Sequence, residues 1–553
     1  MKRSEKESVI TPVARRERGV PSPEAFFATV WARVRPEWIA CFVSALVCGL
    51  VAHAYKLLNW LPNWDSLVFR HNAQNMTHLG RWFLSIACLP SSYYDLPWVC
   101  GALAIFYVAL AAVCVTALFR LRTKVAAALV GALLATFPTV TSTLTYCYVA
   151  DGYALAFLLA VVSAMLFNAR GLKNLILGVV ALTLSLGIYQ AYVSVTMTLF
   201  VVLQFKGLVF SRERALLSLR RAGRFLVGGV LAVLAYMIVL RLVLALTTTH
   251  LSDYLWAPDG ACAFLDPHYP LCVFKSSVKK VLLFFVDVQG GLNLHTVMNA
   301  LMLVSLGALV LRAAFHGRVF RSAVRVVIFF AYVAAAPLCA CPLFLLDPGT
   351  SYHNLMTMGF ASAYVFFVLF YERPMFGRAD FEQLKKWFVL VVGVFAVYDF
   401  ALISNIGYHK LQLAFLSSYG EAVRMANRIE ETPGAKRCKT LAVLGIKPDS
   451  AAWSTHIRLD LTGMTDGSLL RPDDHTVNQS VITATINDYC QKDFRFATIE
   501  ERRALAKDPR VLKMPFWPER GSIAVIDGYV VLRLSAGSGL GDTPLPKPLP
   551  SAD

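Results

Sequence analysis

Long apolar runs, separated by short polar or basic segments, fill most of the first 407 residues of the chain. A helix needs about 20 mainly apolar residues to span a bilayer. The pattern predicts eleven such helices, at residues 38–58, 97–119, 125–141, 148–167, 175–189, 192–209, 225–247, 296–315, 322–346, 355–371 and 387–407. Very short connections join the third helix to the fourth and the fifth to the sixth, so each pair is either a tight hairpin or a broken helix.

The composition indicates a membrane protein rather than a soluble enzyme. Hydrophobic residues make up 57% of the 553 residues and charged residues only 16%, which is too apolar for a soluble chain of this length. The sequence therefore predicts a mainly α, polytopic helical membrane protein of about eleven spans, embedded in a lipid bilayer.

The positions of lysine and arginine predict the orientation, because these residues accumulate in short cytoplasmic loops. With the N-terminus inside, the predicted cytoplasmic segments hold 27 of them and the opposite loops hold five. Loops 59–96 and 248–295 are then outside, and residues 1–37 form a basic cytoplasmic N-terminus before an uncleaved anchor. The net charge of +18 is thus a topogenic and lipid-facing signal, and no nucleic-acid motif accompanies it.

After the predicted membrane domain of residues 38–407, the composition becomes that of a soluble domain. The predicted elements are a partly amphipathic helix at 408–431, strands at 440–444 and 456–461, a helix at 499–507 and a hairpin at 522–534. The hairpin prediction rests on alternation around Asp527-Gly528. We expect a small exterior α+β domain at residues 408–536 and a disordered proline-rich tail at residues 537–553.

Polar side chains gather near the predicted exterior face. No phosphate-binding loop, dinucleotide glycine fingerprint or zinc-protease motif is present. The candidates are Asp65, Arg81 and Asp95 in the first exterior loop, Asp151 at the start of the fourth span, Tyr189 and Gln190 at a hairpin, Arg241 in the seventh span, Lys275, Lys279, Lys280 and Asp287 around the second loop, and His353. Such a ring would surround a cavity that opens to the outside. Residues 67–79 are predicted to form a helix on the membrane surface.

Two pairs of cysteines lie in the predicted exterior segments. Cys262 shares a loop with Cys272, and Cys438 shares the C-terminal domain with Cys490. An oxidising compartment would allow disulfides, but spacing does not decide whether either bond forms. No paired CxxC motif is present, so we expect no cofactor, and a role for a divalent metal ion stays open.

Several of these residues belong to motifs whose order resembles that of a known family. The motifs are Asp65 after the first span, Gly80-Arg81-Trp82, Tyr148-Val149-Ala150-Asp151-Gly152-Tyr153, Ser185-Leu186-Gly187-Ile188-Tyr189-Gln190, Trp517-Pro518 and Ser522-Ile523-Ala524-Val525-Ile526. Over about residues 60–534 the chain resembles the Gtr type II glucosyltransferases of bacteria and their phages. The resemblance implies a GT-C glycosyltransferase of the bacterial inner membrane. It also implies transfer of glucose from undecaprenyl-phosphate glucose to lipopolysaccharide O-antigen on the periplasmic face.

Two residues carry the sharpest hypotheses for such a transfer. Asp65 is placed to take the proton of the acceptor hydroxyl, and the alternative is that it caps a helix beginning at Ser66. Arg241 is a candidate for the donor phosphate, because an arginine within a span is costly and needs an anionic partner. The alternatives for Arg241 are snorkelling or an ion pair with Asp399.

The other candidates have weaker cases, each with a structural alternative. Arg81 binds phosphate or sugar, or anchors its loop, and Asp151 is a second carboxylate or a helix cap. Tyr189 and Gln190 contact ligand or satisfy backbone groups at a helix break. Lys279 and Lys280 attract lipid phosphate or form a solvated face. For Trp60, Trp64 and Trp82, anchoring at the interface is favoured over stacking on sugar rings.

Two functions from other classes stay open. A transporter or flippase for lipid-linked sugars would explain charges within the spans, but it gives no role to an exterior domain or to Asp65. A non-catalytic assembly protein of envelope polysaccharide synthesis would tolerate Asp65→Asn. The sequence does not identify the sugar, the linkage, the acceptor or the oligomeric state.

Overall fold

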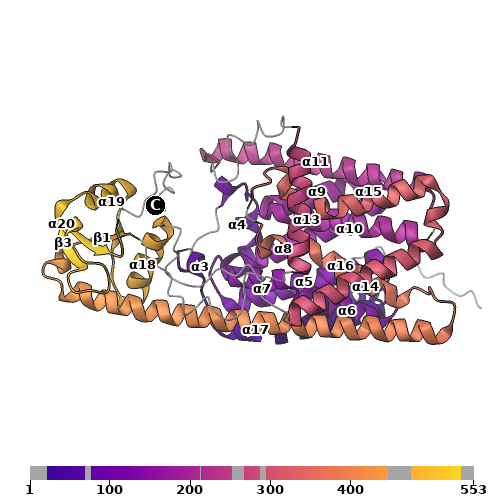
Figure 1. The fold of residues 1–553 in the computed structure, drawn as a ribbon, viewed down its shortest axis with the longest axis horizontal. Coiled ribbons are helices and arrows are strands. Elements are labelled where there is room, and N and C mark those ends of the chain that lie inside the picture. Colours follow the sequence, from indigo (N-terminus) through magenta and orange to yellow (C-terminus); the bar gives the residue numbers. More distant parts are fainter. Residues whose placement is uncertain are drawn as a thin grey trace, which may run out of the picture.

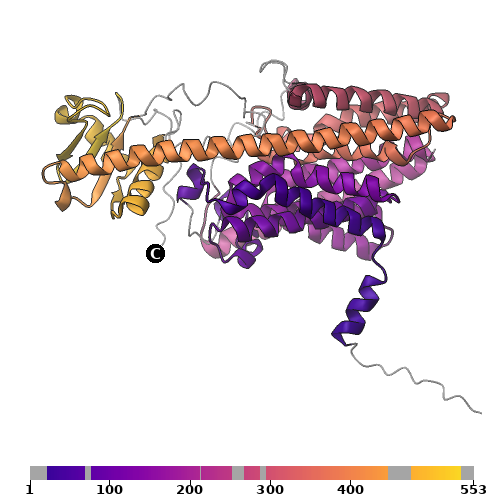
Figure 2. The same ribbon diagram turned by 90° about the horizontal axis from the view of Figure 1, so that it is seen from below.

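A bundle of long helices and a small sheet domain make up the protein (Figure 1). The computed structural model describes residues 22–68, 76–211, 213–251, 267–286, 294–350, 352–445 and 475–536. The sheet domain stands beyond one end of the bundle in both ribbon views (Figures 1 and 2). We call this end of the bundle the domain-facing end and the opposite one the distal end.

All eleven predicted spans are helical. The helices of the bundle are α2 (Pro36–Leu58), α5 (Pro97–Phe119), α6 (Lys124–Thr136), α7 (Pro138–Thr145), α8 (Cys147–Asn168), α9 (Leu172–Ile188), α10 (Val193–Phe205), α11 (Ala215–Thr247), α14 (Leu294–His316), α15 (Ala323–Ala340), α16 (Ala361–Leu369) and α17 (Ala379–Glu431). Among the described residues, nine helical segments are long and apolar enough to cross a membrane. The shorter apolar helices Leu172–Ile188 and Met358–Glu372 correspond to the other two predicted spans.

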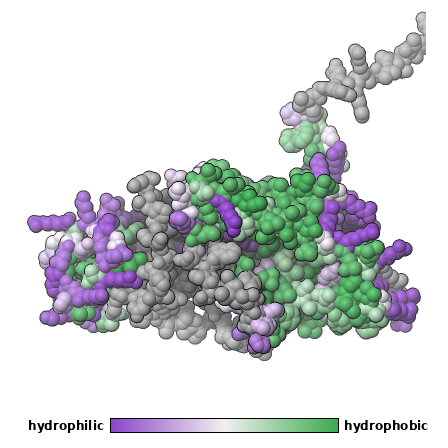
Figure 3. Space-filling view, turned by 90° about the horizontal axis from the view of Figure 1, so that it is seen from above, coloured by the Kyte–Doolittle hydropathy of each residue, from purple (hydrophilic) through white to green (hydrophobic). Residues whose placement is uncertain are grey.

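The surface of the bundle agrees with a lipid environment. Apolar side chains cover its flank between hydrophilic residues at the distal end and the sheet domain (Figure 3). Side chains such as Leu246, Val304 and Val51 are largely exposed, which is favourable in hydrocarbon and unfavourable in water. The prediction of a mainly α polytopic membrane protein is confirmed.

The third predicted span is broken within the bundle. Helix α6 ends at Thr136 because Pro138 cannot donate a backbone hydrogen bond and restricts the residue before it. Helix α7 restarts at Pro138 and directs threonines into the interior. Thr139 hydrogen-bonds Thr357 at 2.9 Å and Thr141 hydrogen-bonds Ser404 at 2.6 Å. The break thus lets a polar segment satisfy its hydroxyls inside an apolar bundle.

The eleventh span and the helix predicted at 408–431 are both helical, and they form one continuous helix. Helix α17 has 53 residues and is about 80 Å long at 1.5 Å per residue. It runs along the bundle and continues beneath the sheet domain (Figure 1). No proline interrupts it before Pro433-Gly434. Bundle and sheet domain are therefore joined by a helix rather than by a flexible linker.

The sheet domain contains four strands in the order β2-β1-β4-β3. They are β1 (Thr440–Leu444), β2 (Arg495–Phe496), β3 (Ile523–Ile526) and β4 (Tyr529–Arg533), with helices α18 (His475–Cys490), α19 (Ile499–Ala506) and α20 (Pro509–Leu512). Strand β1 is fully buried and parallel to both neighbours, whereas β3 and β4 form an antiparallel hairpin. The predicted strand at 440–444, helix at 499–507 and hairpin are confirmed. The strand predicted at 456–461 and the tail from 537 lie outside the described residues.

The sheet domain is fixed to α17 by Trp517. The indole Nε1 donates to Glu421 Oε1 at 2.7 Å, and Arg424 and Arg428 lie over the ring. Cys438 and Cys490 both have free thiols, so the possible disulfide between them is not formed. For the other possible pair, Cys262 lies outside the described residues.

Helices α1 (Pro23–Trp31) and α13 (Tyr269–Phe285) were not among the predicted elements. Helix α1 leads away from the distal end (Figure 2). Helix α13 lies in the predicted exterior loop and runs across the bundle near its domain-facing end (Figure 1). The Tyr269 hydroxyl donates to the Leu345 carbonyl at 3.1 Å, and the Phe284 ring packs against Phe137 at 5.8 Å.

A buried polar network joins α14, α16 and α17. His295 Nδ1 lies 2.6 Å from Asp399 Oδ2, and Asn299 Nδ2 lies 2.9 Å from His295 Nε2. The Tyr364 hydroxyl donates to Asn299 Oδ1. The side chains of His295 and Asp399 are only 6% and 2% exposed. The suggested ion pair between Arg241 and Asp399 is therefore wrong, because Asp399 pairs with His295.

We expect His295→Leu to destabilise the bundle by about 3–5 kcal/mol, because it leaves the Asp399 carboxylate buried without its partner. Replacing both residues by leucine should recover most of this loss, because no charge then stays buried. Unfolding in mixed micelles, followed by circular dichroism, measures both effects. A double variant as unstable as His295→Leu would contradict the pairing.

Candidate functional site

Asp65 lies on a short helix that the sheet domain holds in place. Helix α3 (Trp64–Val68) is capped by Asn63, whose Oδ1 accepts the Ser66 amide at 2.8 Å. Asp65 is therefore not the cap of a helix beginning at Ser66. Leu67 is 3% exposed and packs in the hydrophobic cluster formed by α17, α18 and the sheet. The position of Asp65 thus depends on the sheet domain as well as on the bundle.

Trp60 forms the adjoining contact between bundle and domain. Its Nε1 donates to Asp95 Oδ2 at 3.1 Å, and its ring packs against Phe415 at 5.7 Å and Tyr489 at 6.1 Å. Two predicted exterior segments, the loop at 59–96 and the C-terminal domain, meet here. The structure places Trp60 as a packing residue of this junction.

The surface helix predicted at residues 67–79 is not formed as one element. Helix α3 ends at Val68, and Met76 pairs with Arg81 in an isolated bridge around a 3₁₀ turn at Thr77–Leu79. This turn closes at Gly80, whose φ of +76° favours glycine. Residues 69–75 lie outside the described part of the chain.

Gln190 and Tyr236 hold this turn by hydrogen bonds to its backbone carbonyl groups. Gln190 Nε2 donates to the Leu79 carbonyl at 3.0 Å, and the Tyr236 hydroxyl donates to the Gly80 carbonyl at 3.1 Å. A Cβ on Gly80 would collide with the Tyr236 hydroxyl. Gln190 is thereby a positioning residue for the turn that carries Arg81.

The Arg81 side chain projects among tyrosines. Its Nη1 donates to the Tyr153 hydroxyl at 2.8 Å, and its Cζ lies 4.9 Å from the centre of the Tyr189 ring. The Tyr153 and Tyr189 rings stack on each other at 4.5 Å with an interplanar angle of 12°. Arg81 Nε is buried and has no hydrogen-bond partner among the described residues. A planar guanidinium with an unused donor suits a phosphate or carboxylate ligand.

Asp65 and Arg81 are brought together as electrostatic neighbours. Burial opposes the charge on Arg81, but three neighbouring tyrosines and Asp65 favour it, so the pKa of Arg81 lies above the usual arginine value. Asp65 also lies within electrostatic range of Tyr148. A carboxylate and a permanently charged guanidinium therefore share the domain-facing end of the bundle.

Lys279 and Lys280 are separated by the structure. Lys279 is exposed, whereas Lys280 is partly buried and within electrostatic range of the Cys341 thiol. Cys341 is in range of Tyr352, and Tyr352 is in range of Tyr189. Lys280 therefore lies near Cys341 inside the bundle, and Lys279 lies at the surface.

Two predicted site residues do not join Arg81. Asp151 is fully buried on α8 beside Cys88, and both its carboxylate oxygens lack a hydrogen-bond partner within the described part of the chain. It lies two residues from Tyr153, about 200° around the helix, so the two side chains point apart. Arg241 is exposed, while Leu240 on the same helix is buried. Asp287 lies outside the described residues.

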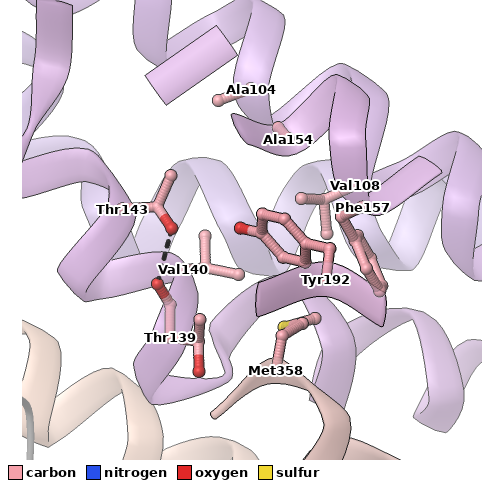
Figure 4. Close-up of a pocket in the computed structure, with 9 residues that line it drawn as sticks. All are labelled: Ala104, Val108, Thr139, Val140, Thr143, Ala154, Phe157, Tyr192 and Met358. Atoms are coloured by element: carbon pink, nitrogen blue, oxygen red, sulfur yellow. Dashed lines mark hydrogen bonds between the residues drawn. The ribbon is translucent and has the colours of Figure 1, made fainter. Parts of the chain in front are cut away.

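A small cavity lies beneath the tyrosine cluster (Figure 4). Its lining residues are Ala104, Val108, Thr139, Val140, Thr143, Ala154, Phe157, Tyr192 and Met358. The Tyr192 ring lies 5.8 Å from Tyr189, and its hydroxyl points toward Thr143 (Figure 4). The cavity has room for about one water molecule. A sugar would therefore not fit in this cavity.

Within the described ranges, no group of three or more His, Cys, Asp or Glu side chains is arranged to hold a metal ion. The residues that the structure brings together at the site are one carboxylate, one guanidinium and several phenols. These groups suit proton transfer and the binding of an anionic ligand.

The apolar bundle with this charged site defines a polytopic membrane protein. The family model for Glucosyl transferase GtrII matches residues 54–371. This range is more than half of the chain, so the protein belongs to the glucosyl transferase GtrII family, and its membership implies glucosyl transfer. The match includes Asp65, Arg81 and Lys280 but not the sheet domain. The comparisons found no curated protein and no solved structure that matches the chain.

Proposed function

We propose that this protein transfers glucose from a polyprenyl-phosphate donor to a cell-surface polysaccharide, O-antigen of lipopolysaccharide, at the domain-facing end of the bundle. We place that end on the periplasmic side of a bacterial inner membrane. The observation that carries the proposal is the presence of Asp65 within electrostatic range of Arg81, at the end of an apolar bundle whose family is a glucosyltransferase family.

In the proposed reaction, Asp65 accepts the proton of the acceptor hydroxyl as its oxygen attacks the anomeric carbon. The bond from that carbon to the phosphate oxygen breaks, and the lipid phosphate leaves with the electron pair. Arg81 stabilises the negative charge on the leaving phosphate, and Lys280 adds a second positive charge nearby. Tyr153 and Tyr189 keep Arg81 in place. Asp151 is proposed only as a buried carboxylate that supports the loop above it.

The decisive experiment uses the full chain in nanodiscs with radiolabelled undecaprenyl-phosphate glucose and O-antigen polysaccharide. Label should appear covalently on the polysaccharide, and its appearance should depend on both substrates. Movement of the lipid-linked sugar across a vesicle bilayer without covalent transfer would instead favour a transporter. Failure of transfer from every polyprenyl-phosphate sugar tested would overturn the proposed donor.

The proposed orientation predicts which cysteines an impermeant reagent can reach. Cys272 on α13 is exposed near the domain-facing end, and Lys173 is exposed at the distal end. In a background with serine at Cys262, Cys438 and Cys490, a charged maleimide should label Cys272 in intact spheroplasts.

The matched control carries Lys173→Cys and Cys272→Ser in the same background. It should become labelled only after the membrane is permeabilised. The reverse pattern would contradict the proposed topology while leaving glucosyl transfer untouched.

A further inference from the structure

A second cluster of positive charge lies at the distal end, away from Asp65. Lys206 begins a π-helical turn, Lys206–Phe210, that continues α10. Its Nζ donates to the Phe119 carbonyl and lies 5.7 Å from the centre of the Phe119 ring. Arg373 packs its guanidinium over Phe210 at 5.4 Å. Turns of this kind inside helices occur often at functional sites.

Arg120 and Arg373 lie within electrostatic range of Lys206. We call Lys206, Arg120 and Arg373 the distal cation cluster. No salt bridge joins any of the three to a carboxylate in the described part of the chain, and Arg212 nearby falls outside that part. The cluster therefore holds an excess of positive charge.

Two carboxylates of this end make their printed contacts elsewhere, although Glu213 Oε2 is buried with no hydrogen-bond partner among the described residues. Glu372 Oε1 accepts the backbone amides of Arg122 and Thr123 at 2.9 and 2.7 Å, which caps the start of α6. Glu213 pairs with Arg221 at 2.9 Å. Glu372 is in range of Lys206, but its first contacts are with the helix start. An additional anion would complete the charge balance of the cluster.

A role in setting the membrane orientation does not by itself account for the distal cation cluster. A lysine or arginine that only sets orientation can extend into water, as the exposed Lys173 and Arg378 do. Lys206 and Arg373 are instead partly buried and fixed by a carbonyl and by aromatic rings. Holding like charges close together is unfavourable unless an anion joins them.

We propose that the distal cation cluster binds the phosphate group of an anionic phospholipid from the leaflet at this end. Lys385 donates to the Arg373 carbonyl, and the following residues of α17, Trp387 and Phe388, are 64% and 38% exposed. An apolar surface thus begins directly beside the cations, which fits a lipid with its headgroup on the cluster and its chains along α17. A soluble phosphate would use only the cations.

Native mass spectrometry of the detergent-solubilised full chain tests this proposal with dioctanoyl phosphatidylglycerol as the probe. Lys206→Met combined with Arg373→Gln should weaken binding by about 25-fold, given the usual contribution of each basic residue to binding an anionic lipid. Dioctanoyl phosphatidylcholine should bind more weakly than phosphatidylglycerol to the wild type, and inorganic phosphate should not compete at lipid-like concentrations.

The matched control is Lys173→Gln combined with Arg378→Gln, which removes the same charge from exposed positions at the distal end. It should change the affinity by less than about twofold.

Arg120→Asn is a third cluster variant, and it should not disturb packing, because Arg120 has φ of +54° and asparagine tolerates this conformation. It should weaken binding by about fivefold.

Equal losses in the control and cluster variants would overturn the site, as would unchanged binding in Arg120→Asn and the cluster double variant together. Competition by inorganic phosphate equal to that of the lipid would overturn the lipid as occupant. Glucosyl transfer is a separate readout, so failure of this proposal would not affect the proposed function.

Discussion

Replacing Arg81 by glutamine is expected to lower kcat for glucosyl transfer by about 10²–10³-fold, the usual cost of removing a donor that stabilises developing negative charge. Arg81 Nη1 donates a hydrogen bond to the Tyr153 hydroxyl, while the buried Nε has no hydrogen-bond partner among the described residues. The positive charge and the unused donor of this guanidinium would stabilise the leaving phosphate. Arg81→Lys keeps the charge but loses the planar stacking on Tyr189, so we expect it to recover only part of the rate.

The control for Arg81 is Arg241→Gln, a second arginine from the predicted exterior half of the bundle. Its side chain is exposed on α11, so its loss should change kcat by less than about twofold. Steady-state transfer assays measure both variants, and thermal unfolding of each shows whether the bundle is intact. Equal losses in the two variants would contradict the assignment of the phosphate to Arg81. A loss in Arg81→Gln that follows only from unfolding would reduce Arg81 to a residue that packs the loop.

Hydropathy predicted the bundle because each spanning helix must be apolar along most of its length. It failed where length or polarity departs from that rule. Helix α13 has only 17 residues and carries Lys275, Lys279 and Lys280, so it resembles a loop in a hydropathy count. Helix α17 changes from apolar to polar without any helix-breaking residue before Pro433. That lack of a stop signal could have predicted a continuous helix.

The candidate site was predictable in its residue types but not in its geometry. Asp65, Arg81, Tyr189 and Gln190 stand in recognisable motifs at predicted span ends, and the structure brings them to one end of the bundle. Adjacent residues on a helix point about 100° apart, so sequence alone cannot say that Lys280 is partly buried and Lys279 is exposed.

The same limit applies to residues of the fourth span and of the bundle interior. Sequence reasoning placed Asp151 at the site as a second carboxylate, yet Tyr153, two residues later, is the residue that contacts Arg81. His295 was missed altogether. A histidine at the start of a span, with an aspartate in another span, was the available signal for that pair.

Asp65→Asn is expected to lower kcat by about 10²–10⁴-fold, the range contributed by general acid–base groups. The amide is nearly isosteric with the carboxylate but cannot accept a proton from the acceptor hydroxyl. Since Asn63 already caps α3, the substitution should leave the helix intact. The KM for the lipid donor should change little, because the proposed reaction assigns the donor phosphate to Arg81 rather than to Asp65.

Asp347→Asn is the matched control, since Asp347 is an exposed carboxylate whose Oδ1 accepts the Gly349 amide at 2.8 Å in a turn. It should retain full activity.

Leu67→Ala tests whether the sheet domain positions Asp65, because Leu67 packs α3 against the hydrophobic cluster that includes α17 and α18. If the domain positions Asp65, Leu67→Ala should lower kcat while the carboxylate is still present, and the loss should be smaller than that of Asp65→Asn. Unchanged transfer in Asp65→Asn would remove Asp65 from the chemistry and leave a non-catalytic or transport function for this end of the bundle.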